Sequence, residues 1–91
     1  MINIEVQIDQ ETRETWYFHM FDLNAVFVYW KREIKPKGKR KWIIERSWDK
    51  YKERDLNSTP RPELPEIIRS QALSEVMKMI RVYTWDEWKK K

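Results

Sequence analysis

The chain has 91 residues, a net charge of +4 and no cysteine, which excludes disulfides and thiolate metal sites. No apolar run reaches the roughly 18 residues that a membrane-spanning helix needs, and the N-terminus lacks a signal-peptide pattern. We therefore expect one small domain, residues 1–91, that works in the reducing cytoplasm without membrane attachment.

Aromatic residues are unusually frequent, because the chain contains six tryptophans, four tyrosines and three phenylalanines. Each of them can bury about 150–250 Å² and so help a short chain to form a stable core. The excess of tryptophan can serve the core, a partner, or both.

The first predicted strand covers residues 2–8, where apolar and polar side chains alternate. One side carries Ile2, Ile4, Val6 and Ile8, and the other carries Asn3, Glu5 and Gln7. A period of two is typical of a strand with one solvated face.

The second and third predicted strands, residues 15–21 and 25–30, are apolar or aromatic on both sides, with a turn at residues 22–24. Alternation places Trp16, Phe18 and Met20 opposite Tyr17, His19 and Phe21, and places Val26, Val28 and Trp30 opposite Phe27 and Tyr29. We interpret His19 as a core residue, because the chain has no cysteine or second histidine that could share a metal with it.

The third strand and a fourth strand, residues 42–48, are expected to form a long hairpin. Pro36 suits the second position of a type I turn, and Gly38 can adopt the positive φ that follows. This three-residue loop would pair Trp30 with Ile44 and Val26 with Trp48. A two-residue loop, which would pair Phe27 with Trp48, is the alternative.

The C-terminal half is predicted to be helical. Residues 49–55 are expected to leave the sheet, and residues 52–64 form a proline-rich connector. From Pro65, as first helical residue, an amphipathic helix buries positions four residues apart: Leu64, Ile68, Ala72, Val76 and Ile80. A capping box at residues 84–87 predicts a short final helix that ends at Lys90.

These elements predict an α+β fold: a four-stranded antiparallel β-meander in residues 1–51, packed by the helical segment 65–90. One helix can cover only one face of the sheet. The aromatic surplus on the other face would be covered if the sheet curled into a half-barrel or a closed barrel. A second copy could also cover it, through strands 15–21 and 25–30 or through Trp85 and Trp88, or the rings could stay exposed for a ligand.

Charge is concentrated in the hairpin, where residues 31–41 contain seven basic residues and one acid. Residues 1–24, by contrast, carry a net charge of −4. We expect the hairpin to contact an anionic partner through Lys31, Arg32, Lys35, Lys37, Lys39, Arg40 and Lys41, flanked by the rings of Trp30, Trp42 and Tyr29.

The combination of basic side chains and rings favours a nucleic-acid-binding protein, since cations attract phosphates and rings stack on unpaired bases. No zinc finger, helix-turn-helix or RNP-type motif accompanies it. The alternative is a protein that docks on an anionic protein surface, in the manner of small phage or mobile-element proteins that inhibit a host protein or a nucleic-acid-processing complex.

An enzymatic function is not expected, and we assign no catalytic, cofactor-binding or metal-binding residue. Glu33 and Lys35, with Asp22 upstream, faintly resemble the acid-x-lysine pattern of metal-dependent nucleases. Such a pattern arises easily by chance where 37% of residues are charged. A single glycine also excludes phosphate-binding loops and dinucleotide-binding motifs.

Overall fold

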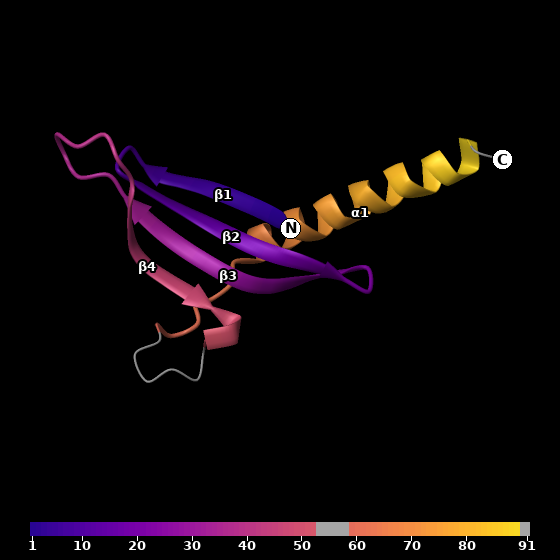
Figure 1. Cartoon of the computed structure of the whole chain (residues 1–91), viewed down its shortest axis with the longest axis horizontal. Coiled ribbons are helices and arrows are strands. Elements are labelled where there is room, and N and C mark those ends of the chain that lie inside the picture. Colours follow the sequence, from indigo (N-terminus) through magenta and orange to yellow (C-terminus); the bar gives the residue numbers. More distant parts are fainter. Residues whose placement is uncertain (53–58, 90–91) are drawn as a thin grey trace.

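The computed structural model describes residues 1–52 and 59–89, with side chains in 1–52 and 59–80. Four strands, β1 (Ile2–Asp9), β2 (Thr12–Phe21), β3 (Asn24–Ile34) and β4 (Ile43–Asp49), precede a 3₁₀ turn, η1 (Lys50–Lys52), and one helix, α1 (Glu66–Lys89). The strands form one antiparallel sheet in the order β1-β2-β3-β4, with α1 against one face (Figure 1). The predicted α+β meander is confirmed.

The sheet is open, with β1 and β4 as its two edges, so the closed-barrel alternative is wrong. A barrel that closes around a core of side chains is built from more strands than the four present here. Four strands cannot enclose rings as large as those of this chain, and a helix takes that place instead.

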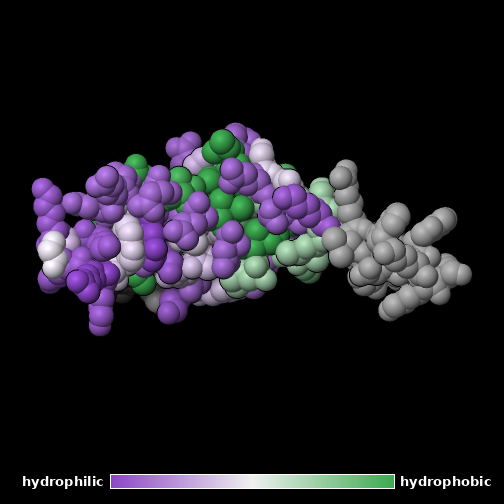
Figure 2. All heavy atoms as spheres, turned by 90° about the horizontal axis from the view of Figure 1, so that it is seen from above, coloured by the Kyte–Doolittle hydropathy of each residue, from purple (hydrophilic) through white to green (hydrophobic). Residues whose placement is uncertain are grey.

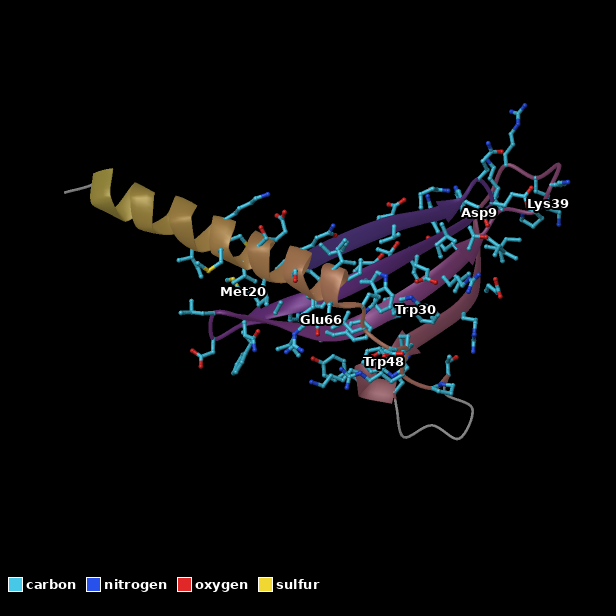
Figure 3. All side chains as sticks on the ribbon, turned by 180° about the vertical axis from the view of Figure 1, so that it is seen from behind. Asp9, Met20, Trp30, Lys39, Trp48 and Glu66 are labelled. Atoms are coloured by element: carbon cyan, nitrogen blue, oxygen red, sulfur yellow. The ribbon has the colours of Figure 1, made fainter. Side chains whose placement is uncertain are left out.

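The core lies between the sheet and α1. Its rings come from β2, β3 and β4, and its aliphatic side chains come mainly from one stripe of the helix: Trp16, Phe18, Phe27, Trp30 and Trp48 pack against Ile68, Ala72 and Val76. Figure 3 shows Trp30 and Trp48 beside the start of α1, near Glu66. The predicted four-residue repeat of the helix is therefore confirmed as its buried face.

The flanks of that helical stripe stay exposed, as Ile67, Leu73 and Met77 show. Figure 1 shows the C-terminal part of α1 running beyond the sheet. The radius of gyration is accordingly 16.5 Å, where a compact chain of this length would have about 12 to 13 Å.

The register of β3 with β4 differs from both sequence-based alternatives. Trp30 lies opposite Trp48 rather than Ile44, and Tyr29 lies opposite Asp49. This register buries Trp48 against Phe27, with ring centroids 4.7 Å apart. It needs a longer connection between the strands, which costs little because loop-closure entropy grows only slowly with length.

Strict alternation also fails in β3. A β-bulge between Tyr17 and Phe18 of β2 leaves Val28 without a partner, because Tyr17 pairs with Tyr29 and Phe18 pairs with Phe27. Phe27 and Trp30 therefore share the core face, whereas the sequence pattern placed them on opposite faces.

The turn at Gly38 lies where the sequence predicts it, but the four residues that form it begin one position later than predicted. The Lys39 amide donates to the Pro36 carbonyl oxygen at 3.0 Å, so Pro36 is the first residue of the turn and not the second. Gly38 has φ +80°, the left-handed conformation that favours glycine.

The helix is continuous from Glu66 to Lys89, so the predicted break and short final helix are wrong. No glycine or proline follows Pro65, and without such a breaker a capping-box pattern does not start a new helix. Pro65 itself lies just before the helix, and its carbonyl oxygen accepts hydrogen bonds from the Ile68 and Arg69 amides, both at 3.1 Å. The side chains of Trp85 and Trp88 lie outside the described part.

The connector between β4 and α1 also packs against the aromatic core. Residues 50–52 leave the sheet as predicted, residues 53–58 lie outside the described part, and residues 59–65 contain no helix or strand. The Arg61 guanidinium lies over the rings of Phe27 and Trp48, at 5.7 and 5.6 Å from their centroids. It therefore shields the edge of the aromatic core from solvent.

The β2–β3 turn supplies a stability prediction. Asp22 and Leu23 both have positive φ, 49° and 62°, and the Leu23 side chain is exposed. An exposed leucine side chain gains little packing energy there, and the left-handed conformation costs it about 1–2 kcal/mol. Leu23→Gly should raise the free energy of unfolding by about 1 kcal/mol in urea denaturation. Leu23→Ala keeps the unfavourable φ and is the control; equal stability of the two variants would contradict the argument.

Candidate functional site

The connection between β3 and β4, residues 35–42, is the most basic segment of the described surface, and we name it the basic loop. It contains five lysines and arginines and no acid. Lys37, Lys39, Arg40 and Lys41 are exposed, and no acidic group of the described residues lies within 4.0 Å of them. Figure 2 shows hydrophilic side chains gathered at this end of the molecule.

Two of the predicted contact residues, Lys31 and Arg32, lie in β3. Their side chains point to opposite faces of the sheet, and both form ion pairs. Lys31 Nζ lies 3.5 Å from a Glu33 carboxylate oxygen. Arg32 lies on the helix side, 4.0 Å from Glu14 and 3.9 Å from Glu45. The strand cations are thus largely neutralised, and the unpaired positive charge lies in the basic loop.

The three predicted rings have different environments. Trp30 is only 6% exposed and lies in the core, so its ring is not available to a partner. Trp42 is half-buried, with the Arg13 guanidinium 4.2 Å from its ring centroid. Tyr29 is half-buried and packs edge-on against Tyr17, with centroids 5.3 Å apart.

The acidic segment 1–24 does not form a separate surface. Antiparallel pairing places Glu5 and Glu14 beside basic side chains of β2 and β3. The β1–β2 turn also reaches the basic loop, since the Lys35 amide donates to the Glu11 carbonyl oxygen at 2.8 Å. Figure 3 shows Asp9 and Lys39 at the same end of the molecule.

Arg13 connects the sheet to the basic loop. Its guanidinium donates two hydrogen bonds to Glu33, Nε to Oε1 at 3.1 Å and Nη2 to Oε2 at 3.3 Å, and it also stacks on Trp42. The hydrogen bonds from Arg13 hold the pKa of Glu33 below its ordinary value although burial opposes this, and Lys31 adds to the effect. The same carboxylate raises the pKa of Arg13.

The sheet face opposite α1, which we name the bare face, contains two adjoining open hollows of about 460 and 330 Å³. His19, Val28 and Tyr51 line both of them. His19 is exposed, so its interpretation as a core residue is wrong: it lies two positions from Tyr17, on the side away from the buried Trp16 and Phe18. The sequence pattern identified a second aromatic face on β2, but it did not place Tyr51 there.

No family model, curated protein or solved structure matches this chain. Within the described ranges, no group of three histidine or acidic side chains could hold a metal ion. None of the described helical residues form a segment long and apolar enough to cross a membrane.

The Arg13–Glu33 pair predicts a pH dependence of stability. Because folding lowers the pKa of Glu33, the unfolded chain binds the proton more readily. Stability from this pair should be complete above about pH 4.3, the ordinary glutamate value, and should fall as the pH drops through the lower folded value. Glu33→Gln should lose about 1–3 kcal/mol at pH 7 and show a flatter acid limb in urea denaturation.

The matched control is Glu63→Gln in the connector, an exposed acid with no ion pair among the described residues. It should leave both the stability at pH 7 and the acid limb unchanged. An acid limb equally steep in wild type and Glu33→Gln would contradict the assignment.

Proposed function

We propose that this protein is a non-enzymatic nucleic-acid-binding protein whose main contact is the basic loop. The observation that carries the proposal is the exposure of Lys37, Lys39, Arg40 and Lys41 without an acidic partner among the described residues. Such side chains bind phosphates and release counterions at little cost, since no internal ion pair has to break.

The anchoring of the basic loop supports the proposal. Trp42 stacks with Arg13 at one end of the loop, and the Lys35 amide bonds to the β1–β2 turn at the other. A loop held at both ends presents its cations in a restricted arrangement, which lowers the ordering cost of binding. The absence of cysteine agrees with a site of action in the cytoplasm.

A second candidate, a protein that docks on and inhibits another protein, is favoured by a different surface. The exposed side chains of Met20, Phe21 and Leu23 gather at the β2–β3 turn, and β1 is an edge strand that could pair with a partner strand. Affinity capture from a lysate with and without nuclease separates the two candidates. A specific protein that is retained after nuclease treatment favours the second.

Matched charge reversals test the first candidate. Lys39→Glu/Arg40→Glu changes the basic loop, whereas Arg69→Glu/Lys78→Glu makes the same change in net charge on exposed residues of α1. Only the loop variant should weaken oligonucleotide binding in fluorescence anisotropy. The slope of log K against log[salt] should become shallower by roughly 1.4 to 1.8, as expected for two lost phosphate contacts.

Thermal unfolding is the control for this comparison. Both pairs are exposed, and the helix variant loses only the exposed Lys78–Glu75 ion pair at 3.3 Å, which is worth about 0.2–0.5 kcal/mol, so both variants should keep nearly the wild-type melting temperature. Equal losses of affinity in the two variants would show that net charge alone drives binding. A salt-independent affinity would also refute the proposed contact.

A further inference from the structure

We infer that the bare face binds single-stranded nucleic acid, with unpaired bases stacking on Tyr51 and His19. This inference rests on the proposed function and deepens it from nucleic acid in general to single strands. It uses side chains that the basic loop does not contain.

The rings on this face are arranged as a platform. Tyr51 is 76% exposed and borders both hollows, together with His19. Tyr17 and Tyr29 pack edge-on against each other and line the smaller hollow. Because α1 covers only the other face, these rings keep sides that a planar base can reach.

The floor of the platform is apolar because of the β-bulge. Val28 is the unpaired residue of that bulge and lines both hollows beside Tyr29, although neighbours in a regular strand would point to opposite faces. Its side chain is only 3% exposed but does not belong to the core on the helix side. With so little exposed surface, Val28 lies beneath the rings and is not itself a stacking surface.

Cations connect this platform to the basic loop. Arg13, Tyr17 and His19 lie on one face of β2, so His19 is about 20 Å from Arg13 along the strand. Lys31 lies between them, with its Nζ 5.8 Å from the Tyr17 ring centroid, and Lys50 borders the larger hollow. Burial lowers the pKa of Lys31, but Tyr17 and Glu33 together outweigh it and raise that pKa above its ordinary value. Arg13 and Lys31 are paired with acids, but Lys50 has no acidic group of the described residues within 4.0 Å. A strand bound at the basic loop can therefore run along this face and meet the charge of Lys50 beside the rings.

The exposed rings distinguish single strands from duplexes. In a duplex the bases are stacked on one another and show only their edges, so protein rings gain no stacking contact with them. Unpaired bases stack on aromatic side chains whatever their sequence. The platform should thus favour single strands over duplexes, without strong sequence preference.

Three probes of about 12 nucleotides test the inference by fluorescence anisotropy: a thymidine oligomer, an abasic oligomer with the same phosphates, and a duplex. The wild-type protein should bind the thymidine oligomer at least about fivefold more tightly than the abasic one. Tyr51→Ala should reduce that difference, Tyr51→Ala/His19→Ala should remove it, and both variants should leave the abasic affinity unchanged. Tyr51→Phe keeps the ring and should retain the wild-type preference.

The outcomes separate this inference from the proposed function. Equal affinity for thymidine and abasic oligomers, or a preference for the duplex, would overturn the stacking platform and leave the basic loop in place. Lack of binding to all three probes would overturn both. Light scattering that shows a dimer, converted to a monomer by Tyr51→Ala, would instead assign the bare face to a second copy.

Discussion

The pairing of Trp30 with Trp48 determines where the surfaces of this molecule lie. With these two residues opposite each other, Trp48 packs on Phe27 and both tryptophans face α1. The same register leaves residues 35–42 outside the sheet as the basic loop, and it places Asp49, followed by η1 and Tyr51, beside Tyr29. The exposed cations and the bare face are both consequences of how the aromatic core packs.

Electrostatic pairing then decides which cations are available. Arg13, Lys31 and Arg32 lie in strands, where each has an acidic side chain within 4.0 Å. Internal ion pairs therefore neutralise most of their charge. In the basic loop, Lys37, Lys39, Arg40 and Lys41 have no acidic group of the described residues within 4.0 Å, so they face solvent. The Arg13–Glu33 pair has a further role, because Arg13 also stacks on Trp42 and so links the stability of the sheet to the position of the loop.

Local patterns predicted much of this fold, and the errors share a cause. Alternation in β1, the four-residue repeat of α1 and the positive φ of Gly38 are local properties, and all three are present, except that Ile8 at the end of β1 is exposed. The hairpin register and the face of Phe27 were predicted wrongly, because both depend on which rings meet across the sheet and on a bulge that no local pattern marks. Trp30 was accordingly assigned to the surface and His19 to the core, the reverse of their actual positions.

By itself the sequence determined the element types, the buried stripe of the helix and the concentration of positive charge near Gly38, because each depends on neighbours along the chain. Tertiary packing determined which of those charges are free, which face of the sheet lacks a helix and which rings line the hollows. These properties arise from contacts between residues distant in sequence, such as Arg13 with Glu33 or Tyr17 with Tyr29, and long-range pairing sets them.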